Sequence, residues 1–127
     1  MTFVDASFLI GFSDASDKWH GRAIALRPRI RRPLTTDLVL AEAVTVIGAR
    51  RGGKAARTLF QFLQDSVQIE FLERGALPEV MDEHLRYDGV LSVADCYSVV
   101  TMRAQGTHEI ASFDEDFDKV TGITRLH

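Results

Sequence analysis

Four acidic residues occupy positions in this sequence where a folded chain could bring them together. Asp5 follows the β-prone segment "TFV", and Asp114 follows the β-prone segment "HEIASF". Glu42 lies in the first turns of the apolar segment "LVLAEAVTVI", and Asp95 lies in the first turn of "SVADCYSVV". Carboxylates that converge in this way repel one another unless a cation joins them. The residue types and their placement therefore indicate a cation site.

The other side chains of the sequence narrow the kind of cation. Cys96 is the only cysteine, and the four histidines form no pair at the spacing of metal ligands. An all-oxygen set of donors suits a hard cation, either Mg²⁺ or Mn²⁺. Such ions polarise a phosphate and generate a hydroxide nucleophile from water. The chemistry that this set of residues predicts is hydrolysis of a phosphodiester bond.

Each acid also has an ordinary structural interpretation. Asp5 could cap the turn into "SFLIG", and Asp95 fits a capping box with Ser92. Asp114 could be the N-cap of "EDFDKV". For Asp95 and Asp114, each taken alone, the capping interpretation is the favoured one. Glu42 could be a surface residue, but its apolar neighbours leave little polar face on that helix, and the four acids together favour the cation site.

The elements that would position these acids alternate between strands and helices. Apolar periodicity and turn signals predict helices over 16–28, 38–50, 54–65, 76–87 and 92–106, and a short helix or turn near 8–14. Strands are expected at 2–4, 33–36, 67–72, 108–113 and 123–127. We expect Asp14 or Ser16 to cap the helix over 16–28. This alternation predicts an α/β fold with a central, mostly parallel sheet of about five strands, and ligands of such sheets bind beyond the carboxyl ends of the strands.

Length and composition indicate a single globular domain over residues 1–127. The chain is 46% hydrophobic and 26% charged, and no apolar run approaches the roughly 18 residues of a membrane span. The N-terminus lacks the basic start of a signal peptide, and there is no second cysteine for a disulfide. We therefore expect a cytoplasmic protein that does not enter a membrane.

The net charge of −3 conceals an uneven distribution. Residues 1–57 contain ten basic and five acidic side chains, whereas residues 58–127 contain five basic and thirteen acidic ones. The basic residues gather in two clusters, "RPRIRRP" and "ARRGGKAAR". Such clusters can contact phosphates, or they can be solvated surface. The sequence leaves both interpretations open.

Four segments, taken in order and spacing, resemble a known family. They are "FVDAS", "TTDLVLAEAVT", "LSVADCYSVV" and "SFDEDFDKV", and they resemble the PIN domain, in particular the single-domain toxins of VapC type. The resemblance implies a three-layer α/β/α fold and a metal-dependent ribonuclease. It also implies roles for particular residues: Asp5, Glu42 and Asp95 as the core metal ligands, Asp114 as the fourth acid, Asp116 as an auxiliary ligand or a charge outside the ligand set, and Ser7 and Ser112 as polar neighbours.

The resemblance implies partners as well. Toxins of this type act on RNA with Mg²⁺ or Mn²⁺, form homodimers and are neutralised by a small cognate antitoxin. Candidates to attract RNA are Arg50, Arg51, Lys54 and Arg57, with the cluster of Arg27, Arg29, Arg31 and Arg32 as the alternative. The apolar stretches "FLIGF" and "TLFQFL" could form protein interfaces or be ordinary core.

Other functions fit the sequence less well. A non-catalytic RNA-binding module of the same fold would not need all four acids, and a housekeeping nuclease of the family would differ only in its target. A phosphatase or receiver domain would need a second Asp two residues after Asp5, or a Lys beside the acids, and the segment "VDAS" supplies neither.

Overall fold

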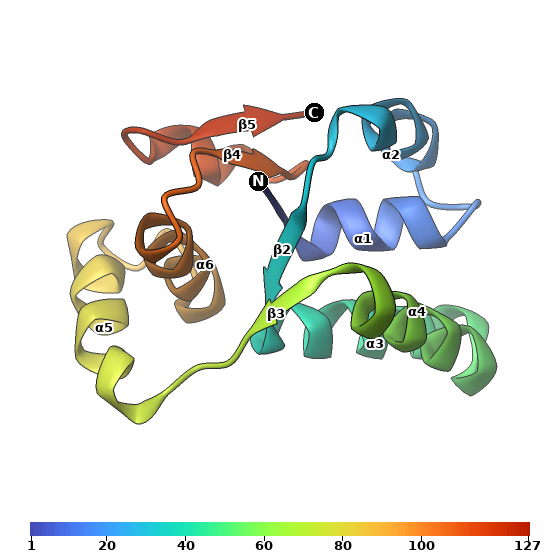
Figure 1. Cartoon of the computed structure of the whole chain (residues 1–127), viewed down its shortest axis with the longest axis horizontal. Helices are drawn as coiled ribbons and strands as arrows, with labels where there is room; N and C mark the ends of the chain where they lie inside the picture. The colour runs from blue at the N-terminus through green and yellow to red at the C-terminus, as the bar shows by residue number, and fades with distance from the viewer.

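The computed structural model describes all 127 residues and contains a five-stranded sheet in which all neighbouring strands are parallel (Figure 1). The strand order is β3-β2-β1-β4-β5. The strands are β1 (Thr2–Val4), β2 (Pro33–Thr36), β3 (Gln68–Glu70), β4 (Glu109–Ala111) and β5 (Thr124–Leu126). All five strands were predicted from the sequence, although β3, β4 and β5 are shorter than expected.

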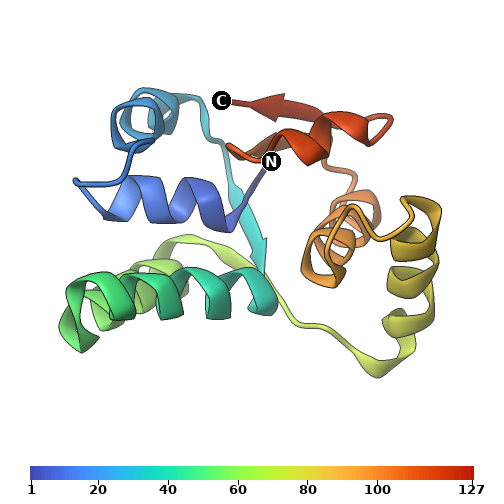
Figure 2. The ribbon, with the colours of Figure 1, turned by 180° about the vertical axis from the view of Figure 1, so that it is seen from behind.

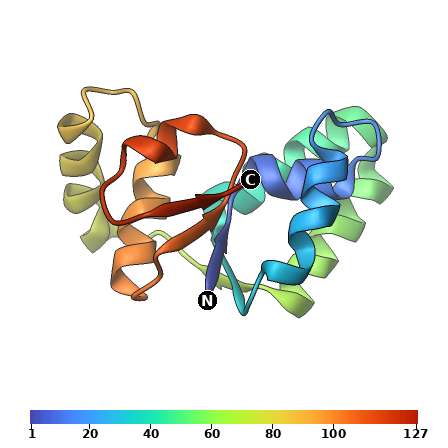
Figure 3. The ribbon, with the colours of Figure 1, turned by 90° about the horizontal axis from the view of Figure 1, so that it is seen from above.

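Helices cover both faces of the sheet. They are α1 (Ala6–Ser13), α2 (His20–Leu26), α3 (Asp37–Arg51), α4 (Gly53–Ser66), α5 (Leu77–Arg86) and α6 (Val93–Ala104), with the 3₁₀ turns η1 (Arg27–Arg29), η2 (Arg74–Ala76) and η3 (Glu115–Lys119). Viewed from above, α1 to α4 lie on one side of the sheet and α5 and α6 on the other (Figure 3), and the view from behind shows the same separation (Figure 2). This is the three-layer α/β/α arrangement that the sequence predicted. None of the helices combines the length and the apolar character that crossing a membrane requires.

The register of the central strand decides which residues meet at the carboxyl edge of the sheet. Strand β1 pairs with β2 on one side and with β4 on the other, and Val4 lies opposite Ala111. The chain leaves both strands at the next residue, so Asp5 and Ser112 emerge side by side. The amide of Asp5 confirms this by donating a 3.1 Å hydrogen bond to the carbonyl oxygen of Ala111.

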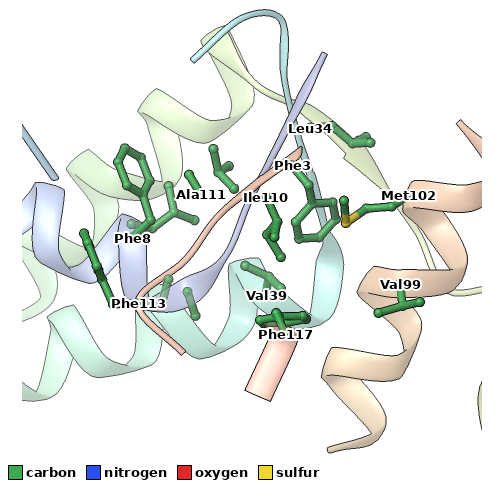
Figure 4. Close-up of a cluster of buried hydrophobic side chains, with 14 of the residues drawn as sticks. Phe3, Phe8, Leu34, Val39, Val99, Met102, Ile110, Ala111, Phe113 and Phe117 are labelled. Carbon is green, nitrogen blue, oxygen red and sulfur yellow. The ribbon is translucent and has the colours of Figure 1, made fainter. Parts of the chain in front are cut away.

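The core fills the space between the sheet and its helices. Phe3, Leu34 and Ile110 on the three central strands are fully buried, as is Met102 on α6 (Figure 4). Burial of such large apolar side chains contributes about 1.5–3 kcal/mol each to folding. Phe113 and Phe117 are also buried, which confirms that they pack into the core and hold the acidic loop between them.

The segment before α2 differs from the sequence prediction. Residues 14–19 form turns, α2 begins only at His20, and neither Asp14 nor Ser16 caps it. Asp14 is instead 1% exposed, and its carboxylate accepts hydrogen bonds from Arg50 and Arg51 at the end of α3. The prediction of a longer, capped helix was wrong because these ion pairs hold the segment against α3, a contact that local sequence does not reveal.

Candidate metal centre at the carboxyl edge of the sheet

Asp5 lies at the centre of a hydrogen-bonded network at this edge. It occupies the N-cap position of α1, is 6% exposed, and makes no side-chain capping bond to the helix. The hydroxyl of Ser7 donates to Asp5 Oδ2 at 2.9 Å, and the hydroxyl of Ser112 donates to the same oxygen at 2.8 Å. No side chain donates to the other oxygen, Oδ1.

Each of the two serine hydroxyls accepts a hydrogen bond from a backbone amide and keeps its own proton to donate. Ser7 Oγ accepts from the amide of Phe113 at 2.9 Å, and Ser112 Oγ accepts from the amide of Asp114 at 3.0 Å. Because a hydroxyl has a single proton to donate, both serines can direct theirs to Asp5. Burial raises the pKa of Asp5, and the hydrogen bonds from Ser112 and Ser7 oppose that shift by stabilising the carboxylate.

Glu42 extends toward the same charges from α3. The helix begins after Thr36, whose hydroxyl accepts from the amide of Val39 at 3.2 Å. Glu42 itself is exposed, so the expectation that apolar neighbours surround it was wrong. Only Val39, Ala43 and Ile47 are buried on this helix, because they form one stripe toward the core and Glu42 lies off it.

The raised pKa of Glu42 indicates which other acids act on its carboxyl group. Partial desolvation of its carboxyl raises the pKa first, and the negative charges of Asp5, Asp95 and Asp114 raise it further. These residues come from β1, α6 and the end of β4, which are distant in sequence. The charges of three acids from other elements therefore act on Glu42.

Asp95 combines a structural role with a place in this region. It forms the predicted capping box, in which its amide donates to Ser92 Oγ at 3.0 Å and its Oδ2 accepts from the Ser92 amide at 3.1 Å. Burial raises the pKa of Asp95, and the charge of Asp5 adds to the shift. Since the cap uses only Oδ2, capping and metal binding do not exclude each other.

Asp114 likewise caps an element and still faces the other acids. Its Oδ1 accepts from the Asp116 amide at 2.9 Å at the start of η3. Asp116 differs, because its Oδ1 forms an ion pair with Lys119 Nζ at 2.8 Å and its charge does not contribute to the raised pKa of Glu42. Glu115 and Asp118 are exposed, as expected from the sequence.

A divalent cation fits the donors of this region. Asp5, Glu42, Asp95 and Asp114 form no ion pair with any Lys, Arg or His, and the basic group whose charge acts on one of them is Arg125, which interacts with Asp114. Carboxylate oxygens are the ligands that Mg²⁺ and Mn²⁺ prefer. In this structure no group of three or more His, Cys, Asp or Glu side chains is placed so that it could hold a metal ion.

Two arginines at the end of α3 form ion pairs within the fold. Arg50 forms ion pairs with Asp14 and Asp17, and Arg51 with Asp14. Their charges are partly offset within the fold, whereas Lys54, Arg57 and the arginines at 27, 29, 31 and 32 form no ion pair. The helical spacing of the cluster gives no sign of this pairing.

Arg125 on β5 supports the acidic loop and was not singled out in the sequence. Its guanidinium forms two 2.9 Å bonds with the carboxylate of Asp118 and a 3.2 Å bond with the carbonyl oxygen of Ser112. These bonds tie β5 to the loop that carries Asp114. No local signal marks this residue, because its partners are seven and thirteen positions away.

Comparison with known proteins identifies relatives of the whole chain. The sequence model of the PIN domain matches residues 2–123. The crystal structure of VapC20 from Mycobacterium tuberculosis, described as a Sarcin-Ricin loop cleaving toxin, aligns with a TM-score of 0.86 and 28% identity over 94% of each chain. FitAcB from Neisseria gonorrhoeae aligns with a TM-score of 0.71 and 13% identity over 100% of this chain and 97% of that chain. PAE2754 from Pyrobaculum aerophilum aligns with a TM-score of 0.67 and 20% identity over 98% of this chain and 87% of that chain. No curated protein matches the sequence.

Proposed function

The chain belongs to the PIN domain family, and from that premise we propose that it is an endoribonuclease dependent on Mg²⁺ or Mn²⁺, the toxin of a toxin–antitoxin pair. The observation that carries the proposal is the pairing of β1 with β4, which joins Asp5 to Ser112 and Ser112 to the amide of Asp114 at one edge of the sheet. The charges of Asp5, Asp95 and Asp114 also raise the pKa of Glu42. Carboxylates at the carboxyl edge of a parallel sheet are a suitable place for a catalytic cation.

The acids and serines of this edge have different roles in the proposed hydrolysis. Asp5, Asp95 and Asp114 would hold the cation, directly or through water, and Glu42 would bind it or orient the attacking water. When bound, the cation supplies positive charge to the scissile phosphate and makes water a better nucleophile. Ser7 and Ser112 fix the carboxylate of Asp5 in one orientation. Asp116 forms an ion pair with Lys119. Its proposed role is that of an auxiliary ligand or of a charge outside the ligand set.

The proposed substrate is RNA with an exposed loop. VapC20, which shares 28% identity over nearly the whole chain, is described as a toxin that cleaves the Sarcin-Ricin loop. The four acids Asp5, Glu42, Asp95 and Asp114, here called the acidic centre, would repel RNA. Basic residues outside the acidic centre must therefore supply the attraction. Lys54, Arg57 and the arginines at 27, 29, 31 and 32 form no ion pairs within the chain and are available for this purpose.

The proposed partners are a cognate antitoxin and a second copy of the chain. Exposed apolar side chains lie on α5 and on the segments beside it, where a single chain leaves them in water. The most exposed are Leu85 at 76%, Phe71 at 68%, Val90 at 49% and Met81 at 48%. These residues support self-association, which sedimentation of the purified protein would measure.

Cleavage of a mixed, structured RNA by the purified protein tests the proposed function. The expected result is cleavage with Mg²⁺ or Mn²⁺ that EDTA abolishes and that Asp5→Asn loses. Asp82→Asn is the matched control, because Asp82 is exposed on α5 and has no side-chain partner. Cleavage that survives EDTA or Asp5→Asn would contradict the proposal. So would a folded protein that neither binds a divalent ion nor cuts RNA.

A further inference from the structure

A hollow lies beside the acidic centre, between the start of α2 and the C-terminal strand. It has a volume of about 260 Å³ and is lined by Trp19, Arg22, Phe113, Glu115, Arg125 and His127. The ribbon shows the end of β5 directed toward α2 (Figure 1). None of these residues belongs to the proposed ligand set, yet Phe113 and Glu115 flank Asp114 in the chain.

Trp19 is held in a fixed position at this hollow. Its indole stacks on the ring of Phe113, with ring centroids 4.9 Å apart and an interplanar angle of 10°. Its amide donates to Asp17 Oδ2 at 2.9 Å. The absence of a side chain at Gly11 permits the close approach of α1, because a Cβ there would lie 3.2 Å from the Cβ of Trp19.

The anchoring of Trp19 extends to α3. Asp17 accepts a 2.8 Å bond from Arg50, and the adjoining Asp14 accepts from Arg51 at 2.7 Å. The ion pairs at the end of α3 therefore hold the segment that presents the indole. The half-buried indole of Trp19 is therefore held in one position by its stacking on Phe113 and by the bonds of Asp17.

Phe113 links the indole to the acidic centre. Its ring lies under Trp19, and its amide donates to Ser7 Oγ, which in turn donates to Asp5. Asp114 is the next residue in the chain. A group resting on the indole would thus be connected to Asp5 through Phe113 and Ser7.

Two cations without ion-pair partners lie over the indole of Trp19, and one of them, Arg22, lines the hollow. Lys18 Nζ lies 5.2 Å and Arg22 Cζ lies 5.5 Å from the centroid of the Trp19 ring. Neither forms an ion pair, whereas Arg125 is occupied by Asp118. An aromatic face with free cations at its rim is the combination that binds single-stranded nucleic acid, since the base stacks and the backbone phosphate is neutralised.

We propose that this hollow binds one unpaired nucleotide of the RNA next to the scissile phosphate, with its base on the indole of Trp19 and its phosphate at Lys18 and Arg22. The base takes the position over the ring that the two cations occupy, and the cations turn to the backbone. The subsite rests on the proposed ribonuclease function and adds a preference for looped or single-stranded RNA, because a paired base cannot reach the indole.

Trp19 is the only tryptophan of the chain, so its fluorescence reports on the subsite directly. We would titrate the Asp5→Asn protein in Mg²⁺ with a short single-stranded RNA and follow both tryptophan emission and the anisotropy of a label on the RNA. The expected result is quenching by the single strand, and none by a duplex or by an abasic strand of the same length. By anisotropy, Trp19→Ala in the same background should weaken binding about 5- to 100-fold, which is the contribution of one stacked base.

Matched variants separate stacking from charge and from folding. Trp19→Phe keeps an aromatic face and should retain most of the affinity, while Arg22→Gln should weaken the abasic and the normal strand alike. Equal quenching by normal and abasic strands, or unchanged affinity in a Trp19→Ala protein with a native circular dichroism spectrum, would overturn the subsite. If the wild-type protein still cleaves RNA, the proposed function survives that outcome. A protein that neither binds nor cleaves RNA would overturn both.

Discussion

Ser112 and Asp5 lie 107 positions apart in the sequence and are joined by a 2.8 Å hydrogen bond at the end of two neighbouring strands. The same hydroxyl accepts from the amide of Asp114. A single buried serine thus connects the acid that follows β1 with the acid that follows β4. The pairing of Val4 with Ala111 brings these residues together, so the geometry of the centre follows from the register of the sheet.

Ser112→Ala should impair both stability and activity. The change removes a hydrogen bond to a buried carboxylate and leaves the Asp114 amide without its acceptor, so we expect a loss of about 1–3 kcal/mol in the free energy of unfolding. The less firmly held Asp5 should reduce kcat/KM about tenfold. Urea unfolding and initial cleavage rates measure the two effects.

Ser98→Ala is the matched control for that variant. Ser98 is also buried, but its hydroxyl donates to the carbonyl oxygen of Ala94 within α6. It should change stability and leave the cleavage rate of the folded protein intact. Equal rates for Ser112→Ala and Ser98→Ala would show that Ser112 does not position Asp5.

Asp95 and Ser92 allow the capping role to be separated from the catalytic one. Asp95→Asn keeps an oxygen that can accept from the Ser92 amide, so we expect little change in melting temperature and a loss of activity of about 10²-fold or more. Ser92→Ala should do the opposite, with a loss of about 1 kcal/mol in stability and near-normal activity. If Ser92→Ala and Asp95→Asn reduce activity equally, Asp95 acts only as a cap.

Glu42→Gln should stabilise the protein while it abolishes activity. The pKa of Glu42 is raised, which means that the folded state disfavours its ionised form, and removing the charge relieves repulsion from Asp5, Asp95 and Asp114. Because Glu42 is exposed, the gain in unfolding free energy should be only a few tenths of a kcal/mol. Thermal unfolding without divalent ions measures it, and a lower melting temperature would contradict the proposed clustering.

Asp14 should make stability depend on acid pH. Arg51 foremost, and then the hydrogen bonds from Ser16, hold the pKa of Asp14 well below its usual value of 3.8. A lowered pKa means that the contribution of Asp14 is complete above 3.8 and is lost as the pH falls through the folded-state pKa. Asp14→Asn should therefore reduce the unfolding free energy near pH 7 and flatten its decline toward about pH 3. A parallel pH profile for the wild type and the variant would contradict this.

Sequence alone predicted the parts of the fold that depend on local pattern. All five strands, the helix cap at Thr36 and the capping box of Ser92 and Asp95 could be read from apolar periodicity and capping residues. The position of Asp5 beside the end of β4 also follows from the predicted parallel sheet, because parallel strands place their carboxyl ends at one edge. The PIN resemblance, which rested on these same motifs, is confirmed by the family match over residues 2–123.

Long-range contacts set the limit of sequence analysis. Nothing in "FSDASDKW" marks Asp14 as the partner of Arg51, which lies 37 positions away, so the helix that the local pattern predicted does not form. The apolar neighbours of Glu42 were expected to leave little polar face on its helix, whereas only Val39, Ala43 and Ile47 form the buried stripe of α3 and Glu42 is exposed. The stacking of Trp19 on Phe113 is equally invisible in sequence, since it depends on where α2 meets the end of β4.

The binding of Mn²⁺ to the purified protein, measured by electron paramagnetic resonance, tests the central claim most directly. The account predicts that the wild-type chain binds Mn²⁺, that Mg²⁺ competes for the same site, and that Asp5→Asn and Glu42→Gln each weaken binding at least about tenfold. Asp82→Asn should bind as the wild type does. Folded wild-type protein that binds no Mn²⁺, or whose binding is unchanged by Asp5→Asn, would contradict the claim that these carboxylates form a metal centre.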